Sequence, residues 1–315
     1  MEPERTRVLV LNYNGRDLLA ECLPSLVEAA RRSPIPCALT VVDNGSADGS
    51  IEYLSAAWPE VEVVREPNRG LASFNAVLAR VDEPIVLLLN NDVKLDRDAI
   101  GPLLDALVTN ENCLFAAPLC WTFDGREYEG MRTRVRTRFG LVQGMSRVPG
   151  FERHVHRPDR TAAAGPVLAV DRRKFLALGG YDPVYFPGRI EDLDLAYRGW
   201  MAGWAGLYVP ASVAYHKGFG SFGPAFGRSG CDTLAARNTM IFAWKNLSGR
   251  RLAAHLAWLP ARAMHAALTG RLGFLRAIIG ALTLLPAAIR ARKAQRAGRG
   301  DWNGRQEAFF RRFAW

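Results

Sequence analysis

The chain has 315 residues, of which 49% are apolar and 23% charged, and this composition allows a large core and excludes a disordered protein. Its formal net charge of +10 lies in the C-terminal part, because residues 245–315 hold 14 Lys and Arg against 2 Asp and Glu, whereas residues 1–244 hold 27 against 29. Since the rest of the chain has no basic excess and no helix-turn-helix pattern, we expect no binding to nucleic acid.

The cysteines and the N-terminal residues indicate the compartment of the protein. Five cysteines are scattered and none forms a Cys-x-x-Cys pair, so we expect neither a disulfide framework nor a zinc site. Residues 1–7 carry charges of both signs and lead directly into the first predicted strand, which leaves no apolar secretory segment. We therefore expect a cytoplasmic protein.

Strands and helices alternate over roughly the first hundred residues. Apolar runs predict strands over residues 7–13, 38–43, 61–65 and 85–89, and helical spacing of apolar side chains predicts helices over residues 17–30, 48–57 and 71–81. Strands joined by helices in this order indicate a doubly wound, mostly parallel sheet of the α/β class that binds a nucleotide.

The first two predicted strands each end in polar residues. Asn12-Tyr13-Asn14-Gly15 follows the first strand and holds one glycine, which argues against the G-x-G-x-x-G turn of nicotinamide and flavin enzymes. The second strand ends at Asp43, whose carboxylate could accept hydrogen bonds from a base or a ribose. Alternatively, residues 43–45 form a turn and Ser46 or Asp48 caps the next helix.

The strand over residues 85–89 runs into Asn90-Asn91-Asp92. Ligands bind outside the carboxyl ends of strands in open α/β sheets, so these side chains lie where a ligand is expected. Their oxygen atoms suit a hard divalent cation that also contacts phosphate. The alternative is a polar turn that leads into a helix over residues 97–107, since Asn and Asp are ordinary turn residues.

Two arginine- and acid-rich motifs stand out in the second half. Arg132, Arg134, Arg136 and Arg138 alternate with other residues, which places them on one face of an extended segment that either meets acceptor phosphates or is solvated. Glu191-Asp192-Leu193-Asp194 opens a predicted helix. Acids are favoured in a first helical turn, but three of them in four residues exceed what capping requires.

Residues 217–230 are rich in glycine, with Phe219, Phe222 and Phe226 between the glycines. Such a segment either closes over a bound ligand as a lid or is an irregular loop. His216 precedes it, and a lone histidine is more often a structural residue.

The chain changes character from about residue 250. Its longest uncharged run there, residues 277–289, is too short for a membrane span, which needs about twenty residues. We expect helices in the membrane interface, with Arg290, Arg292, Lys293, Arg296 and Arg299 facing anionic lipid and Phe309, Phe310, Phe313 and Trp315 as apolar anchors. The alternative is a helical cap on the catalytic domain. The expected domains are residues 1–245 and residues 246–315.

Several separated motifs together resemble family 2 glycosyltransferases, and are most similar to the rhamnosyltransferase-like branch. They are Leu11-Asn12-Tyr13-Asn14-Gly15, Val42-Asp43-Asn44-Gly45-Ser46 with its continuation to Ser50, Asn68-Arg69-Gly70 and Leu89-Asn90-Asn91-Asp92. The resemblance covers about residues 5–245. It implies a GT-A fold, a nucleotide-sugar donor, Mg²⁺ or Mn²⁺, and inversion at the anomeric carbon.

The resemblance also implies roles for residues. Asp192 would be the general base, with Glu191 orienting the acceptor or the base, and Asn90, Asp92 and His216 would bind the metal. The implied donor contacts are Asn12, Tyr13, Asp43, Asn68, Arg69, Asn91 and Arg237. Where the family has Asp-x-Asp, this chain has Asn90-Asn91-Asp92. A neutral amide is a weaker ligand than a carboxylate, so we expect low metal affinity before the donor binds.

The sequence therefore predicts an inverting glycosyltransferase at the cytoplasmic face of the membrane, which transfers sugar to a glycan or polyprenyl-linked acceptor in cell-surface polysaccharide synthesis. One alternative is a sugar-nucleotidyltransferase, although the glycine- and arginine-rich loop expected after its first strand is absent. Another is a catalytically silent, membrane-bound assembly protein, suggested by the altered metal motif.

Overall fold

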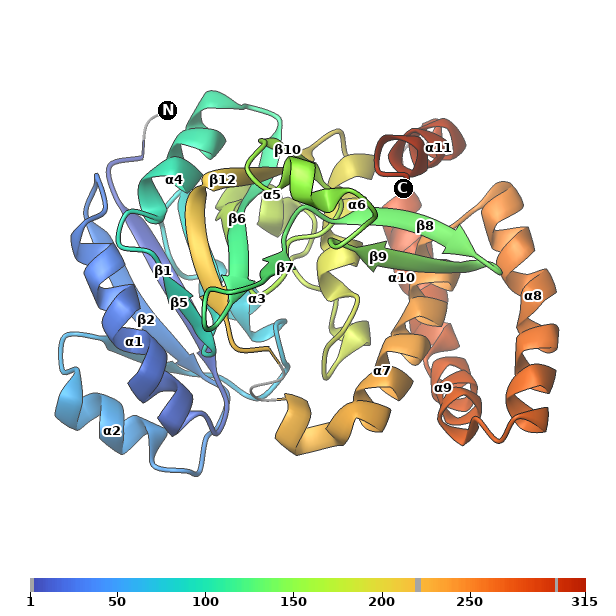
Figure 1. Ribbon diagram of the computed structural model, residues 1–315, viewed down its shortest axis with the longest axis horizontal. Coiled ribbons are helices and arrows are strands. Elements are labelled where there is room, and N and C mark those ends of the chain that lie inside the picture. Colours follow the sequence, from blue (N-terminus) through green and yellow to red (C-terminus); the bar gives the residue numbers. More distant parts are fainter. Residues whose placement is uncertain (1–2, 219–221, 298–299) are drawn as a thin grey trace.

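The computed structural model describes residues 3–218, 222–297 and 300–315, and in it a central sheet is covered by helices on the left of Figure 1 and joined to a helical region on the right. The strand order is β10-β12-β6-β11-β4-β1-β2-β3, with β5 paired to β12 and β7 paired to β6. The strands β1 to β4 are mutually parallel, as are β6 and β12, whereas β11 runs antiparallel to both β4 and β6. The predicted α/β class with a mostly parallel sheet is confirmed.

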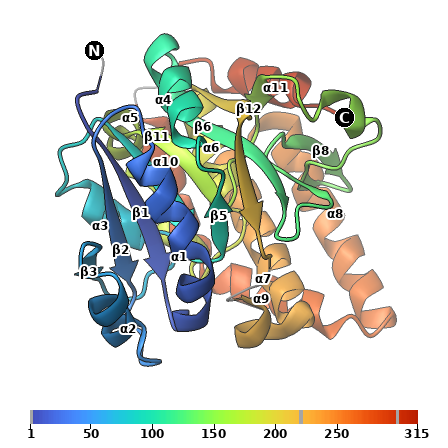
Figure 2. The same cartoon turned by 60° about the vertical axis from the view of Figure 1, so that its left-hand side comes forward.

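The first half of the chain follows the predicted alternation. Its strands are β1 (Thr6–Asn12), β2 (Cys37–Asp43), β3 (Glu62–Arg65), β4 (Ile85–Asn90) and β5 (Val93–Leu95), and its helices are α1 (Arg16–Arg31), α2 (Ser50–Ala57), α3 (Ser73–Leu78) and α4 (Ile100–Thr109). Right-handed crossovers put α1 and α2 on one face of the sheet and α3 on the other (Figure 2). The short strand β5, which the sequence analysis missed, separates the polar triplet from α4.

The apolar strand β4 lies in the interior of the sheet, between β1 and β11. Its residues 85–89 are at most 6% exposed, because helices cover both faces and the strand has neighbours on both edges. The first and larger hydrophobic core surrounds this strand. The carboxyl ends of β1, β2 and β4 consequently share one edge of the sheet.

The second half adds long-range strand pairs that local patterns did not predict. Its strands are β6 (Cys113–Thr122), β7 (Tyr128–Gly130), β8 (Arg134–Arg138), β9 (Leu141–Met145), β10 (Asp159–Thr161), β11 (Val167–Asp171) and β12 (Ala205–His216). Between them lie α5 (Arg172–Ala177), α6 (Glu191–Met201) and the 3₁₀ turns η1 (Phe151–His154) and η2 (Pro183–Tyr185). The strands β8 and β9 form a separate hairpin.

Five helices complete the chain: α7 (Phe222–Asn246), α8 (Gly249–Leu268), α9 (Leu272–Thr283), α10 (Leu285–Arg296) and α11 (Trp302–Arg312). They share a second hydrophobic core with α6, to which Tyr197, Phe242 and Phe309 contribute. The ring centroids of Tyr197 and Phe309 are 5.0 Å apart. The C-terminal helices therefore pack on the helix that begins with Glu191 and Asp192.

This packing corrects part of the expectation for the tail. Phe309, Phe310 and Phe313 are 1%, 4% and 1% exposed, so the prediction that they anchor the protein in a membrane is wrong. Trp315 is half-buried and stacks with the Arg136 guanidinium at 3.9 Å. The aromatic side chains face inward because each covers apolar surface of another helix.

Two of the basic residues assigned to lipid also face inward. Arg292 donates to the carbonyl oxygens of Trp244 and Leu247, and Arg296 donates to the carbonyl oxygens of Asn246 and Leu247. These carbonyls lie at the C-terminal end of α7, where a helix has unpaired acceptors that cations stabilise. Arg290 and Lys293 are exposed, and Arg299 lies outside the described residues.

No single helix within the described residues is long and apolar enough to cross a membrane. The pair α9 and α10 passes a test of length and composition when taken together, but the two helices are bent by 57° at their junction.

Candidate active site

Side chains from three neighbouring strands meet at the carboxyl edge of the sheet. Strand register places Asn12 opposite Asp43 and Leu11 opposite Asn90. The Asn91 side-chain amide donates to Asn12 Oδ1 at 2.7 Å, and Asn12 Nδ2 donates to Asp43 Oδ1 at 3.2 Å. Gly15 permits this approach, because a Cβ atom there would lie 2.0 Å from Asn91 Nδ2. These hydrogen bonds hold the ends of β1, β2 and β4 together.

Asp43 organises the loop that follows β2. Its Oδ2 atom accepts hydrogen bonds from the backbone N–H groups of Gly45 and Ser46, and its Oδ1 accepts one from the Ser46 hydroxyl at 2.5 Å. Gly45 takes a positive φ of 82°, which few other residues tolerate. Asp43 is fully buried. Its bonds to Gly45 and Ser46 form the turn over residues 43–45 that was the alternative to a nucleotide contact.

Three charged side chains lie in a row beside the end of β4: Asp92, His216 and Glu129. Pairing of β12 with β5 places His216 opposite Val93, next to Asp92. The imidazole Nε2 atom lies 3.4 Å from Asp92 Oδ1, and Nδ1 lies 2.6 Å from Glu129 Oε1. Burial alone would lower the pKa of His216, but the two carboxylates raise it to about 9. The ring is therefore a cation at neutral pH when nothing else binds there.

Glu191 and Asp192 occupy the first turn of α6 and are half-buried. The Tyr181 side chain and the backbone N–H of Gly165 lie near Asp192 and favour its ionised form, which lowers its pKa. Burial raises the pKa of Glu191 to about 7, whereas burial and repulsion by Glu191 raise the pKa of Asp192 well above its ordinary value. One oxygen of each carboxylate has no hydrogen-bond partner within the described residues. Two such carboxylates near neutral pH can accept and hold protons.

The backbone before α6 is strained. Arg189 and Ile190 have φ angles of 81° and 74°, although neither is glycine. The Asn238 side chain of α7 donates to the carbonyls of Tyr185, Gly188 and Arg189 at 2.7–2.9 Å and so holds the segment in place. Strain of this kind persists only where surrounding contacts enforce it, and it is typical of functional sites.

The acidic pair adjoins the polar edge of the sheet. The backbone N–H of Asn90 donates to the Pro166 carbonyl at 2.9 Å, and the backbone N–H of the preceding residue, Gly165, lies near Asp192 and favours its ionised form. These two adjacent residues, which precede β11, therefore lie between the end of β4 and the carboxylate. The structure brings Asp192 and the Asn90–Asp92 triplet to the same part of the molecule.

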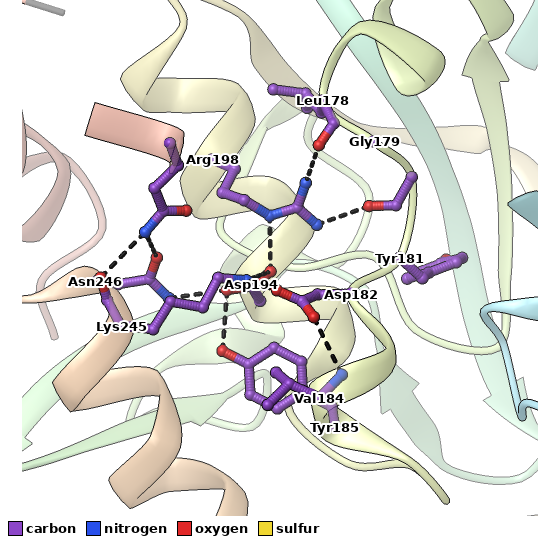
Figure 3. A network of polar contacts seen from close by, with 12 residues as sticks. Leu178, Gly179, Tyr181, Asp182, Val184, Tyr185, Asp194, Arg198, Lys245 and Asn246 are labelled. Carbon is purple, nitrogen blue, oxygen red and sulfur yellow. Dashed lines mark hydrogen bonds and ion pairs between the residues drawn. The ribbon is translucent and has the colours of Figure 1, made fainter. Parts of the chain in front are cut away.

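Asp194, the third acid of the motif, has a different environment. It is fully buried and binds Arg198, Lys245 and Asn246, while the Tyr185 hydroxyl donates to it at 2.9 Å (Figure 3). Although burial opposes ionisation, the Lys245 and Arg198 cations hold the pKa of Asp194 well below its usual range. Lys245 also pairs with Asp182 at 2.5 Å. This network joins α6 to α7 and is structural.

The remaining predicted donor contacts surround the same region. Tyr13, Asn68 and Arg69 are exposed. The loop over residues 68–70 touches the segment before α6, because a Cβ on Gly70 would lie 2.7 Å from the Pro187 carbonyl oxygen. Arg237 of α7 is half-buried and donates to the Phe186 carbonyl oxygen at 2.5 Å. These four residues line the approach between the sheet edge and α7, and their contact with a donor stays a prediction.

The structure accounts for part of the alternating arginines over residues 132–138 and for part of the glycine-rich segment over residues 217–230. Arg132 and Arg134 pair with Asp159, so they are not a solvated face. Gly223, Gly227 and Gly230 lie within α7, whose helix is interrupted at Gly227, with φ of 62°. Phe219, Gly220 and the side chain of Phe222 lie outside the described residues, and the lid stays a prediction.

Sequence reasoning missed Glu129, Tyr181 and Asn238. Glu129 lies in a three-residue strand with no local pattern, and Asn238 belongs to no motif that the sequence analysis singled out. Tyr181 lies in the Gly179-Gly180-Tyr181-Asp182 turn, where Asn75 bonds both the N–H and the carbonyl of Tyr181. A Cβ on Gly180 would lie 2.1 Å from Asn75 Oδ1, so the conspicuous glycine pair was the available signal.

Among the described residues, no group of three or more His, Cys, Asp or Glu side chains is arranged to hold a metal ion. Asp92 and His216 suit a cation that takes its other ligands from a bound molecule. Asp92 Oδ1 is buried, has no hydrogen bond within the described part of the chain and faces His216 Nε2. A carboxylate oxygen and an imidazole are both ligands of Mn²⁺ and similar ions.

Solved structures share the architecture. One is a mannosyltransferase from Pyrobaculum calidifontis in complex with GDP-Man and Mn²⁺, with a TM-score of 0.53 and 18% identity over 94% of this chain and 87% of that one. Another is GalNAc-T7 with UDP, GalNAc and Mn²⁺, with a TM-score of 0.54 and 21% identity over 68% of this chain and 44% of that one. This likeness confirms the GT-A fold.

Sequence comparison agrees with the fold. An N-acetylglucosaminyl-diphospho-decaprenol L-rhamnosyltransferase of Mycobacterium tuberculosis is 29% identical over 273 residues, which cover 77% of this chain and 85% of that protein. A putative polypeptide N-acetylgalactosaminyltransferase 10 of Drosophila melanogaster is 23% identical over 64% of this chain and 34% of its own length. Residues 7–176 match the family described as Glycosyl transferase family 2. The chain therefore belongs to glycosyltransferase family 2, as its rhamnosyltransferase-like motifs predicted.

Proposed function

We propose that this glycosyltransferase moves a sugar, with inversion, from a nucleoside diphosphate donor to a polyprenyl-linked glycan acceptor in cell-surface polysaccharide synthesis. The observation that carries the proposal is the half-buried Glu191–Asp192 pair, which adjoins the polar carboxyl edge of β4 through Gly165 and Pro166. The Mycobacterium tuberculosis relative is named for an N-acetylglucosaminyl-diphospho-decaprenol acceptor, and that name supports a lipid-linked acceptor here.

Asp192 is the proposed general base. Its unpaired oxygen accepts the proton of an acceptor hydroxyl while that hydroxyl oxygen forms a bond to the anomeric carbon and the bond from this carbon to the donor phosphate oxygen breaks. The nucleoside diphosphate leaves with the bonding electrons. Attack from the side opposite the leaving group inverts the anomeric configuration. Glu191 orients the acceptor and raises the pKa of its neighbour, which strengthens the base.

The proposed metal ligands are Asp92 and His216, with Asn90 as a weaker ligand, and the donor diphosphate supplies the rest. A bound Mg²⁺ or Mn²⁺ acts as a Lewis acid that stabilises charge on the departing diphosphate. Asn90 is the last residue of β4, and its side chain is half-buried. Because the protein supplies only two strong ligands within the described residues, we expect metal affinity to rise when the donor diphosphate adds its own oxygen ligands.

The donor's nucleoside is proposed to lie over the ends of β1 and β2. The loop held by Asp43 and the exposed side chains of Tyr13, Asn68 and Arg69 surround this place. Asn12 and Asn91 are buried and bond to each other, so they support this surface from below. Arg237 would meet the diphosphate, because it reaches the segment that precedes Glu191.

A membrane surface is the proposed partner of the C-terminal helices. The exposed apolar residues Leu256, Met264, Leu268, Leu272, Ile279, Leu282 and Ile289 are here called the apolar tail surface, and each is at least 41% exposed. In α9, the small residues Ala277 and Ala281 are buried while Ile279 is 64% exposed. A helix in water buries its large apolar side chains, so this inverted arrangement favours contact with lipid.

Charge and position support the same partner. Arg271, Arg276, Arg290 and Lys293 are exposed on the helices that carry the apolar tail surface, and they complement anionic headgroups. The turn between α8 and α9, the carboxyl ends of β1 and β2 and the start of α7 lie at the same lower end of the molecule in Figures 1 and 2. A lipid-linked acceptor at the cytoplasmic face of the membrane would thus lie at the same end of the molecule as the proposed donor site.

The test is transfer in vitro. The purified full chain is incubated with Mn²⁺, a short-chain polyprenyl diphosphate N-acetylglucosamine and a panel of nucleoside diphosphate sugars that includes rhamnose donors. NMR of the product gives the anomeric configuration. We expect inverted product from the wild type and from Asp124→Asn, whose carboxylate is exposed, and none above background from Asp192→Asn. Retained configuration, or undiminished transfer by Asp192→Asn, would overturn the mechanism.

A further inference from the structure

His216 lies between two carboxylates, and each of its ring nitrogens faces one of them. Nε2 is 3.4 Å from Asp92 Oδ1, and Nδ1 is 2.6 Å from Glu129 Oε1. We infer that Glu129 is a positioning residue, which fixes the tautomer and the orientation of His216 so that Nε2 is presented next to Asp92 to a divalent cation. This inference rests on the proposed function, because it concerns the metal named there.

The strands bring Glu129 to the histidine. His216 pairs with Thr122 of β6, and the same strand pairs on its other edge with β7, through Trp121 and Tyr128. The side chain of Glu129 therefore reaches across β6 to the end of β12. No local sequence pattern relates residues 92, 129 and 216, and only the sheet brings them together.

The contact is directional. A carboxylate has no proton to donate at neutral pH, so the short contact requires a proton on Nδ1. With Nδ1 protonated, Nε2 is the nitrogen that can lose its proton and bind a cation. Histidine ligands commonly donate their other N–H to a carboxylate in this way, and loss of that carboxylate typically lowers metal affinity 10- to 100-fold.

The surroundings of Glu129 and His216 fit a role in metal binding better than a role in stabilising the fold. Glu129 Oε2 and Asp92 Oδ1 are buried and lack hydrogen bonds within the described residues. A buried oxygen without a hydrogen bond destabilises a fold. Asp92 Oδ1 faces His216 Nε2 at 3.4 Å without a hydrogen bond, and a cation bound between them would satisfy this oxygen.

The experiment measures Mn²⁺ affinity directly. Electron paramagnetic resonance of free Mn²⁺ gives the dissociation constant of the full chain, with Mn²⁺ alone and with Mn²⁺ plus UDP, GDP or TDP. The variants are Glu129→Ala, Glu129→Gln, His216→Ala and the matched control Glu127→Gln. Glu127 lies two residues from Glu129, is 68% exposed at its side chain and pairs only with Arg147 among the described residues.

We expect Glu129→Ala to weaken Mn²⁺ binding about 10- to 100-fold. Glu129→Gln should recover a large part of the affinity, because its amide oxygen still accepts from Nδ1–H, and Glu127→Gln should bind as the wild type does. Wild-type affinity in both Glu129 variants, together with weak binding by His216→Ala, would overturn this inference and leave the proposed metal site intact.

Two further outcomes separate the inference from the proposed function. Equal Mn²⁺ binding by His216→Ala and the wild type would overturn the metal site, and the role of Glu129 with it. If Glu129→Ala does not fold, the comparison of Glu129→Met with Glu127→Met decides, since methionine fills a similar volume but offers no carboxylate or amide oxygen to Nδ1–H. A reduction in Mn²⁺ affinity confined to Glu129→Met supports the inference, and equal affinities overturn it.

Discussion

The indole Nε1–H of Trp200 donates to the carbonyl oxygen of Arg305 at 3.0 Å, and this bond joins α6 to α11. The rings of Phe309 and Phe313 pack on the same indole, with centroids 6.0 Å and 5.4 Å away. The helix that begins with the acidic pair is therefore held by the last helix of the chain.

Phe309→Ala should destabilise the whole fold. The side chain is 1% exposed in the second core, and truncation of a buried phenylalanine costs about 3–5 kcal/mol. Denaturant unfolding followed by tryptophan fluorescence measures the difference. The exposed Leu268, substituted by Ala, is the control and should change stability by less than about 0.5 kcal/mol. Equal effects of the two substitutions would show that α11 does not support the core.

Lys245→Met should also destabilise, through charge. Lys245 is 1% exposed and pairs with Asp194 and Asp182. Its removal leaves a buried carboxylate with Arg198 as the remaining cation, and breaking a buried ion pair costs about 3–5 kcal/mol.

The same substitution should change the response to acid. A depressed pKa of Asp194 means that its contribution to stability is present above the ordinary pKa and is lost as pH falls. With Lys245 gone this pKa rises, so the melting temperature of Lys245→Met should begin to fall at a higher pH than that of the wild type. Parallel melting curves across pH 3–6 would argue against the assignment.

The pH dependence of transfer should report the acidic pair. The proposed mechanism needs ionised Asp192, and burial raises the pKa of Glu191 to about 7 and the pKa of Asp192 well above its ordinary value. We therefore expect kcat/KM to rise with pH through the neutral range. Glu191→Gln removes a repelling charge, which lowers the pKa of Asp192 and moves the rise to lower pH. An unshifted profile in Glu191→Gln would mean that the two carboxylates are not coupled.

Asp43→Asn should weaken donor binding more than it slows the chemical step. The amide replaces an oxygen that accepts from backbone N–H groups or from the Ser46 hydroxyl, so the loop over residues 43–46 must rearrange. We expect KM for the donor to rise about 10-fold or more, since a lost charged hydrogen bond is worth about 1.5–3 kcal/mol. Asp48→Asn is the matched control, because Asp48 is exposed and bonds Arg16 N and Ser50 instead. A similar KM in both variants would contradict a special role for Asp43.

Serine at Leu268, Leu272 and Ile279 should reduce membrane binding without unfolding the protein. These side chains are 80%, 57% and 64% exposed, so they contribute little to the core. In flotation with anionic vesicles, we expect the triple variant to bind about 10-fold or more weakly, because each lost apolar contact with lipid removes roughly 1 kcal/mol or more. Neutral vesicles should bind the wild type less than anionic ones. Unchanged flotation of the variant would refute the docking surface.

The sequence predicted the first half of the fold well, because each βα unit there is a local pattern: β4 was recognised from its unbroken apolar run, and the polar triplet marked the end of that strand. It did not predict β6, β11 and β12, whose partners lie far away in the chain and whose pairings no local period encodes. Glu129 was missed for the same reason.

Among the three acids of the motif at residues 191–194, local rules could not assign roles. Asp194 differs from Asp192 through its bonds to Tyr185, Arg198, Lys245 and Asn246, and the last two come from a helix some fifty residues later in the chain. The phenylalanines of α11 look like lipid anchors in a basic segment until Tyr197 and Trp200 are known to face them. In both cases the environment, and not the residue, decides the function.

The second core has a consequence for protein engineering. Since α7 to α11 share apolar contacts with α6, exchanging the C-terminal helices between relatives to retarget an enzyme to another lipid would also replace the helices that pack on α6. Chimeras should therefore be made together with matched substitutions at Tyr197 and Trp200, or they will lose turnover for reasons unrelated to the membrane.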